Sequence, residues 1–180
     1  VTISATSGLT AQARAEVRSL IDVPLLAHIA ARRSTDVDAA AQTAPGSLAI
    51  LHALAAEGKV LRVASDAADP AASAAARSLA DVLNNAGVPA RAVSDELPAV
   101  AGQGLPAGEV DLVVHWRTSD GGSNALASRI ACPPDTGRAG NLSGYCTPAG
   151  EEVARQILAG GVSLQSAAAR VAEIEDREVL

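Results

Sequence analysis

The stretch Val110–Cys146 decides the fold and reads VDLVVHWRTSDGGSNALASRIACPPDTGRAGNLSGYC. It opens with an apolar run, Val110–Trp116, which has the length and composition of a buried strand. The run breaks abruptly into a polar, glycine-containing turn, Arg117–Asn124. Because ligands of open α/β sheets bind outside the carboxyl ends of the strands, the stretch predicts a central strand followed by a ligand site. The first residues of that candidate site are Trp116, Arg117, Ser119 and Asp120.

A strand–helix–strand unit precedes this stretch. Val60–Ala64 has the pattern of a short strand, and Val88–Val93 has the pattern of a second one. Between them a helix is expected from the N-cap Asp69 to Asn84 or Asn85, with a proline at its first position. Parallel strands joined by a helix, and then a third strand, predict an α/β fold with a mixed sheet flanked by helices.

Shorter elements complete the expected order, and no internal repeat is apparent in the sequence. Turn and capping residues divide the rest of the chain into helices and loops. The expected elements are a strand at Val1–Thr6, a helix from the N-cap Thr10 to Leu20, a second helix capped by Asp22 with Pro24 in its first turn, a connector from Ser34 to Gly46, a helix at Leu48–Ala56 closed by Gly58, a helical turn at Leu97–Val100, a loop from Gly102 to Gly108, and two final helices at Glu151–Ala159 and Ser163–Glu175.

The composition excludes several classes of function. The 180 residues carry a net charge of −6, which disfavours nucleic acid, since affinity for phosphates comes from clustered Lys and Arg. One Trp, one Tyr and no Phe also leave no platform for stacking bases. No apolar run approaches the roughly 20 residues that span a bilayer. Leu, Ile, Val and abundant Ala must therefore form the core of one domain, or of two small ones.

The two cysteines, Cys132 and Cys146, bracket a loop-like stretch rich in Pro and Gly. This arrangement favours a disulfide, which stabilises by roughly 3 kcal/mol in the chain-entropy model and indicates an oxidising compartment. The alternative is a pair of buried thiols that pack as small hydrophobic groups. A zinc site is disfavoured because no histidine lies near and no CxxC spacing exists.

No set of residues has the arrangement of a catalytic nucleophile and its base. There is no G-x-S-x-G elbow, and His28 and His52 lie within helical segments. His115, at the end of a strand, is the best placed of the three histidines. The glycines from Gly102 to Gly108 precede a strand, whereas a dinucleotide loop follows one. The sequence therefore indicates a protein that is not an enzyme and that uses no cofactor or metal.

Four motifs resemble the family 5 solute-binding proteins, the extracellular peptide-binding components of ABC importers. They occur in the family's order and cover nearly the whole chain. They are the helix motif Val17-Arg18-Ser-Leu-Ile-Asp22, the strand–helix–strand unit from Val60 to Val93 with Asn-Ala-Gly87 ending its helix, the strand motif Asp111-Leu-Val-Val-His-Trp116, and the turn Asn141-Leu-Ser-Gly-Tyr145 followed by Pro148.

The resemblance implies a periplasmic-binding-protein-like class II lobe. Residues 1–180 would then be a single lobe, excised from a longer two-lobe chain, and would pack against the second lobe of that chain. The chain departs from the family at the strand motif. Counting from Trp116, Ser119 occupies the position of the aspartate that pairs with a peptide's α-amino group, His115 replaces a glycine, and Arg117 adds a positive charge. These departures argue against ordinary peptide capture, although Asp120 is adjacent.

Two functions follow from the resemblance. The Ala-rich, aromatic-poor sequence and the cysteine pair are similar to a divergent branch of mycobacterial lipoproteins, which implies a lipid-anchored regulator of phosphatidylinositol mannoside and lipoarabinomannan synthesis in the cell envelope. Its partner would be a membrane mannosyltransferase or a lipoglycan intermediate. The alternative is the oligopeptide-binding component of an ABC importer, with a short peptide and the permease as partners. A monomer is expected in either case. The predicted ligand- or partner-binding residues are His115, Trp116, Arg117, Ser119, Asp120 and Asn124.

Overall fold

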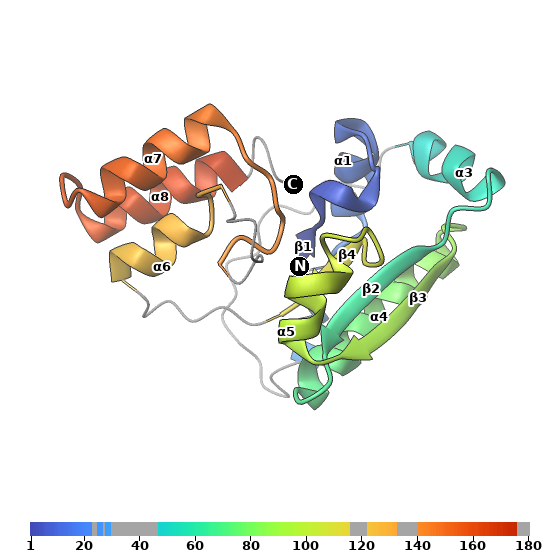
Figure 1. Cartoon of the computed structure of the whole chain (residues 1–180). Helices are drawn as coiled ribbons and strands as arrows, with labels where there is room; N and C mark the ends of the chain where they lie inside the picture. The colour runs from blue at the N-terminus through green and yellow to red at the C-terminus, as the bar shows by residue number, and fades with distance from the viewer. Residues whose placement is uncertain (23–24, 27, 30–46, 116–121, 133–139, 176–180) are drawn as a thin grey trace.

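A mixed sheet forms the centre of the structure, a computed structural model that describes residues 1–22, 25–26, 28–29, 47–115, 122–132 and 140–175 (Figure 1). Within these residues four strands pair in the order β1-β4-β2-β3. Strand β2 is parallel to both β3 and β4, whereas β1 is antiparallel to β4. The strands are β1 (Thr2–Ile3), β2 (Leu61–Asp66), β3 (Ala90–Asp95) and β4 (Leu112–Val114). The predicted fold class, an α/β fold with a mixed sheet flanked by helices, is confirmed.

Helix α4 (Pro70–Asn85) is the crossover between β2 and β3 and covers one face of the sheet. Asp69 is its N-cap as predicted, because its carboxylate accepts from the main-chain N–H groups of Ala71 and Ala72. The helix buries Leu79 and Leu83 against the sheet, while its alanines let helix and strands approach closely. Truncating either leucine to alanine is expected to cost about 2–5 kcal/mol, the usual range for buried leucines.

The opposite face of the sheet is covered by α5 (Leu97–Ala99) and a π-helical turn, Val100–Gly104. The sequence predicted a loop from Gly102 to Gly108, and this prediction is wrong for its first residues. The helical path continues because Val100 and Leu105 are buried against the sheet. Burial of these apolar side chains outweighs the helix-breaking tendency of the glycines.

Two N-terminal helices, α1 (Ala11–Ser19) and α3 (Ala49–Ala56), complete the first core. Thr10 caps α1 as expected, since its hydroxyl accepts from Ala13 N–H. The first turn of α3 is capped by Glu16 of α1, a buried residue whose carboxylate accepts from the N–H groups of Ile50 and Leu51 at 3.3 and 2.9 Å. A carboxylate at a helix N-terminus satisfies otherwise unpaired donors and complements the helix dipole.

The first strand is shorter than predicted. The pattern of Val1–Thr6 indicates a strand, but β1 ends at Ile3 and the chain turns into a 3-10 helix, Ala5–Ser7. The Ser4 hydroxyl caps that helix by accepting from the Thr6 N–H. A serine that satisfies a nearby main-chain donor competes with strand pairing, and here it ends the strand.

Asp111 joins the starts of β2 and β4 to the end of β1. Its carbonyl accepts from Ser4 N–H, and its N–H donates to the Arg62 carbonyl. Its carboxylate is fully buried, lies 2.6 Å from Lys59 Nζ and accepts from the Arg62 N–H at 2.8 Å. Lys59 is the single lysine among 14 basic residues, and its ammonium also donates to the Ser7 carbonyl. These contacts fix β1, β2 and β4 relative to one another.

Three further helices form a unit with its own core, seen at the left of Figure 1. They are α6 (Gly122–Ser128), α7 (Pro148–Leu158) and α8 (Leu164–Ile174). The two predicted C-terminal helices are confirmed, although α7 begins at Pro148 because Thr147 caps it by accepting from Gly150 N–H. We call α6–α8 the helical unit and the rest of the described chain the sheet unit. Among the helices described, none is long and apolar enough to cross a membrane.

Candidate functional site

The parallel strands β2, β3 and β4 end together at one edge of the sheet. The registers place Ser65 beside Val114 of β4 on one side and beside Ser94 of β3 on the other. His115 follows β4, so it lies at the same edge. This is the edge at which open α/β sheets bind ligands. The architecture therefore puts His115 at the position where the sequence predicted a site.

Three serine hydroxyls are linked at this edge. Ser65 donates to the hydroxyl of Ser73 in the first turns of α4 at 3.1 Å, and Ser73 donates to the carbonyl of Asp66 at 3.2 Å. The Ser94 hydroxyl lies 3.3 Å from Ser73. Because Ser73 gives its one proton to Asp66, it accepts from both of the other serines. Ser73 thus joins the ends of β2 and β3 to α4.

The carboxylates at the edge stabilise the chain as it leaves each strand. One oxygen of Asp66 accepts from Ala68 N–H at 3.0 Å, and one oxygen of Asp95 accepts from Glu96 N–H at 2.8 Å. The Asp66 bond, to a donor two residues further on, is typical of turns that begin with aspartate. The same side chains give the edge a negative charge.

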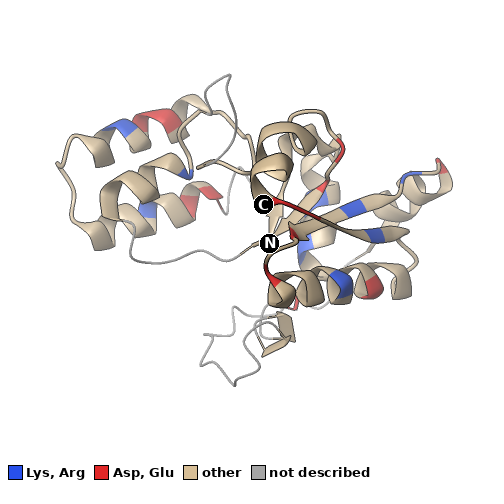
Figure 2. Cartoon of the chain, turned by 60° about the horizontal axis from the view of Figure 1, so that its bottom comes forward, with Lys and Arg blue, Asp and Glu red and all other residues tan. Residues whose placement is uncertain are grey.

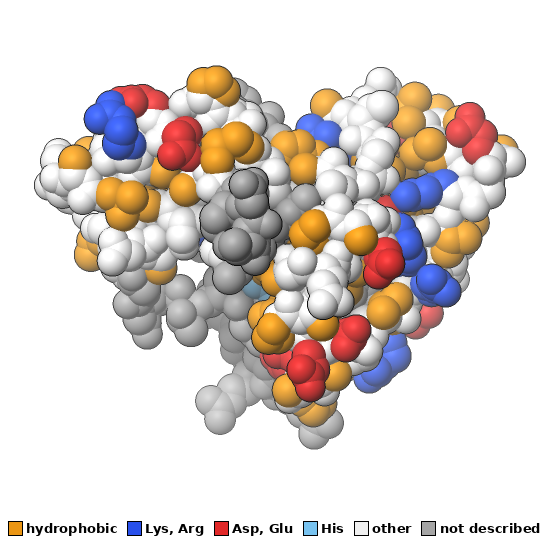
Figure 3. All heavy atoms as spheres, in the orientation of Figure 1, with side chains coloured by type: hydrophobic (Ala, Val, Ile, Leu, Met, Phe, Trp, Pro, Cys, Tyr) orange, Lys and Arg blue, Asp and Glu red, His pale blue; other side chains and the backbone are white. Residues whose placement is uncertain are grey.

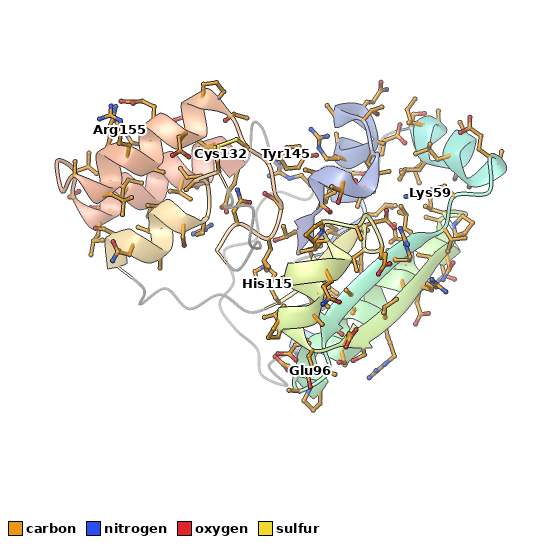
Figure 4. All side chains as sticks on the ribbon, viewed as in Figure 1. Lys59, Glu96, His115, Cys132, Tyr145 and Arg155 are labelled. Atoms are coloured by element: carbon orange, nitrogen blue, oxygen red, sulfur yellow. A yellow bond between two sulfur atoms is a disulfide. The ribbon has the colours of Figure 1, made fainter. Side chains whose placement is uncertain are left out.

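His115 is half-buried and contacts the first strand. Its Nε2 lies 3.0 Å from the hydroxyl of Thr2, which is itself buried. Figure 4 places His115 on the side of the sheet unit that faces the helical unit. Sequence reasoning did not identify Thr2 as its partner, because the two residues are far apart in the chain and meet only through the antiparallel pairing of β1 with β4.

The other predicted site residues divide into two groups. Trp116, Arg117, Ser119 and Asp120 lie outside the described residues. Asn124 was predicted in the turn that follows β4, and this prediction is wrong: it is an exposed residue of helix α6. The Gly-Gly-Ser composition suggested a turn, but Ala127 of the same segment is buried in the core of the helical unit, which favours a helix. His115 and Asn124 therefore belong to different units.

The predicted disulfide between Cys132 and Cys146 is confirmed, with the two Cα atoms 4.6 Å apart. Asn141 connects the same two chain segments without a covalent bond. Its side-chain amide donates to the carbonyls of Ala131 at 2.9 Å and Tyr145 at 2.8 Å, the residues next to each cysteine. The disulfide and the Asn141 amide therefore hold one loop closed together.

The segment between Asn141 and Cys146 also joins the two units. Leu142 is buried in the core of the sheet unit, and the Ser143 carbonyl accepts from Ala5 N–H at 2.7 Å. Arg14 of α1 lies over the ring of Tyr145, with its guanidinium carbon 4.8 Å from the ring centre. Burial raises the pKa of Tyr145 above its ordinary value, and the positive charge of Arg14 partly offsets this. Figure 4 shows Tyr145 between α1 and the helical unit.

One sequence signal for the carboxyl edge was missed. The strands β2 and β3 read LRVASD and ARAVSD, and the register places the two Arg, the two Ser and the two Asp residues opposite one another. This local repeat predicts that the serine pair and the aspartate pair share one edge. By contrast, neither Thr2 nor Arg14 has a signal in the local sequence, since each acts through a contact that the tertiary fold creates.

Comparisons with known proteins place this fold in a class. The sequence matches no protein-family model and no curated protein. The structure is similar to the crystal structure of a substrate-binding protein from Microbacterium hydrocarbonoxydans complexed with 4-hydroxybenzoate hydrazide, with a TM-score of 0.59 and 20% sequence identity. The similarity covers 91% of this chain and 38% of that protein. The chain therefore has the fold of part of a substrate-binding protein.

The scope of this similarity decides what is confirmed. The α/β fold and its likeness to a solute-binding-protein lobe are confirmed. The finer assignment to family 5 stays a prediction. Because the chain spans 38% of the neighbour's length, the activity of a whole substrate-binding protein comes to this chain only as a proposal.

Proposed function

We propose that this chain is a ligand-binding lobe of an extracytoplasmic substrate-binding protein and that it binds a small molecule without transforming it. The likeness of its fold to a substrate-binding protein carries the proposal. Two observations support it. Three parallel strands end at one edge, with His115 beside them, and a disulfide suited to an oxidising compartment is present.

In this proposal the ligand contacts the chain where it leaves β4. His115 stands at that point, and its bond to Thr2 fixes the imidazole relative to the sheet. The proposed contacts that follow are Trp116, Arg117, Ser119 and Asp120, with Asn124 contributed by the helical unit. The remaining part of the site would come from the second lobe of the longer chain, against which this lobe packs.

The finer function that we propose is regulatory. Resemblance to mycobacterial lipoproteins of the LpqW type supports a lipid-anchored protein that controls phosphatidylinositol mannoside and lipoarabinomannan synthesis, through a membrane mannosyltransferase or a lipoglycan intermediate. The serine at position 119, where peptide binders have an aspartate, favours this function over transport. The competing function is peptide capture for an ABC permease, with Asp120 binding the α-amino group.

Ligand-dependent thermal unfolding tests the proposal. Mixed short peptides and 4-hydroxybenzoate hydrazide would be added separately to the protein. A ligand present at 1,000 times its dissociation constant stabilises the folded state by about 4 kcal/mol. His115→Ala should weaken that stabilisation, whereas Glu109→Ala, an exposed residue away from the carboxyl edge, should leave it unchanged. Stabilisation by peptides would support the importer function and contradict the regulatory one.

Ser119→Asp separates the two functions more sharply. If peptides stabilise this variant but not the wild type, the wild-type protein has a peptide site that lacks only the carboxylate at position 119. If neither ligand stabilises either protein, and no mannosyltransferase or lipoglycan intermediate is retained with the protein from solubilised membranes, the ligand-binding proposal fails. If both the wild type and Glu109→Ala retain a mannosyltransferase from solubilised membranes, the regulatory function is supported.

A further inference from the structure

Strand β3 is the outermost strand on one side of the sheet, and half of its main-chain groups point away from the sheet. We call this unpaired side the rim of β3. The strand pairs with β2 over all six of its residues and lies last in the strand order (Figure 1). The bonds that flank this ladder run from Leu61 N–H to the Pro89 carbonyl and from Ala67 N–H to the Asp95 carbonyl. In a parallel pair, alternate residues direct their N–H and C=O to the same neighbour. The odd-numbered residues of β3 therefore face β2, and its even-numbered residues face away.

One of these outward residues is already paired. The side-chain amide of Asn84 donates to the Ala90 carbonyl and its oxygen accepts from the Ala90 N–H, both at 2.9 Å. This amide takes the place of a neighbouring strand at the start of β3. Among the described residues, no partner is found for the outward main-chain groups of Ala92 and Ser94, so this part of the rim has room for one short strand.

The charges along β3 are not balanced by β2. Arg91 lies directly opposite Arg62, and Asp95 lies directly opposite Asp66. Figure 2 shows basic residues on neighbouring strands of the sheet, and Figure 3 shows acidic and basic side chains gathered on the sheet unit. Like charges opposite one another destabilise a sheet. Arg62 is neutralised by Asp111, but Arg91 is exposed and no ion-pair partner for it is found in the described parts of the chain.

We propose that the rim of β3 binds the same rim of a second copy of this chain in antiparallel orientation. Only outward residues can exchange hydrogen bonds across the contact, so Ala92 must lie opposite Ser94 of the second copy, and Ser94 opposite its Ala92. This register uses both open residues of each copy. Registers shifted by two residues in either direction would need Ala90, which Asn84 occupies, or would leave the strand at Glu96.

The same register matches the charges. It sets Arg91 opposite Asp95 of the second copy, and Asp95 opposite its Arg91, while Val93 meets Val93 on the two-fold axis. The hydrogen-bond pattern alone determines the register, and the charge pattern agrees with it. In an antiparallel pair these three positions are the non-hydrogen-bonded ones, where side chains lie closest together. The two sheets would become continuous, with the α4 helices of both copies on one face.

This arrangement departs from the monomer that the family resemblance implies. The contact is small, so we expect a weak, reversible dimer with a dissociation constant on the order of 100 μM. Sedimentation velocity of the protein at concentrations up to about 1 mM would detect it. Arg91→Asp should weaken the dimer roughly tenfold or more, because each substitution replaces attraction with repulsion at two symmetric places.

A charge reversal and a matched control make this test specific. Adding Asp95→Arg to Arg91→Asp restores opposite charges in the same register, so most of the affinity should return. Arg170→Asp makes the same change of net charge on helix α8 of the helical unit and should leave the dimer unchanged. A protein that stays monomeric at the highest concentration, or a dimer equally weakened by Arg91→Asp and Arg170→Asp, would overturn the proposal.

Cysteine cross-linking tests the register itself. Val93→Cys should form an intermolecular disulfide under mild oxidation, because residues on the two-fold axis in a non-hydrogen-bonded pair have Cα atoms about 4.5 Å apart. Ala92→Cys should not form this disulfide. The side chain at position 92 points to the other face of the sheet from that at position 93, and in the proposed register it lies opposite Ser94 of the second copy. Equal cross-linking of the two variants, or none of Val93→Cys at concentrations where the wild type dimerises, would refute the register.

Discussion

Replacing Asp111 with alanine is expected to lower the free energy of unfolding by about 3 kcal/mol. The one-sided loss of a buried ion pair costs roughly 3–5 kcal/mol. The lower end applies because the Lys59 and Arg62 side chains are 28% and 24% exposed, so water replaces part of what the carboxylate supplied. The main-chain N–H of Arg62 also loses this acceptor, a loss that alone costs roughly 1–3 kcal/mol for a buried group.

Differential scanning calorimetry, or urea unfolding monitored by circular dichroism, measures this change. For a domain of this size, each kcal/mol shifts the midpoint by roughly 2–4 °C, so Asp111→Ala should melt about 6–12 °C lower. Glu109→Ala removes an exposed carboxylate two positions earlier and should change the free energy of unfolding by less than about 0.5 kcal/mol. Asp111→Asn keeps an acceptor for the Arg62 N–H and should fall between the two.

The comparison of these variants can refute the reasoning. If Asp111→Ala has the same melting temperature as Glu109→Ala, the buried carboxylate does not hold the three strands together. If Asp111→Asn is as stable as the wild type, the hydrogen bonds matter and the charge does not. In that case Lys59→Met should still destabilise, because the lysine ammonium donates hydrogen bonds to both Asp111 and the Ser7 carbonyl.

Three further outcomes follow from contacts described above. Glu16→Gln should lower the free energy of unfolding in urea by about 1–2 kcal/mol, because a neutral amide caps α3 more weakly. Glu16→Asp should destabilise too, because the shorter side chain no longer reaches the N–H groups of α3. Asn141→Asp should cost roughly 2–3 kcal/mol, since a carboxylate would face two carbonyls that now accept from the amide; a double-mutant cycle with removal of the disulfide should show coupling, and independent effects would contradict the shared role. Tyr145 should ionise above pH 10.0, so its contribution to stability is present below that pH and is lost as the pH rises through the higher folded-state pKa; ultraviolet titration of this single tyrosine measures the pKa, and Arg14→Ala should raise it further.

Local sequence signals predicted the elements whose ends are set by their own residues. Asp69 and Thr10 cap their helices as predicted, because an N-cap needs only a side chain that reaches donors two or three residues away. The parallel order of β2, α4 and β3 also followed from the sequence, since a helical crossover of this length requires it. The disulfide was favoured by cysteine spacing and loop composition alone.

The sequence failed where distant contacts override local preference. Val100–Gly104 contains glycines typical of a loop, yet it is helical. Its first residue, Val100, and the residue that follows the segment, Leu105, are buried against the face of the sheet opposite α4. Asn124 was assigned to a turn because no local feature shows that Ala127 is buried between helices. Glu16 looks like an ordinary exposed helix residue, and only the packing of α1 on α3 makes it a cap.

The separate core of the helical unit has a consequence for how the protein unfolds. Among the described residues, the core formed by α6, α7 and α8 uses only residues between 126 and 174, and the disulfide closes the loop that connects α6 to α7. Such a unit can open as one cooperative element while the sheet remains intact. Native-state hydrogen exchange should then show two levels of protection, lower for the amides of α7 and α8 than for those of β2 and α4. Calorimetry would then show a smaller first step for the helical unit, and the shift expected for Asp111→Ala would appear in the main transition, which belongs to the sheet unit.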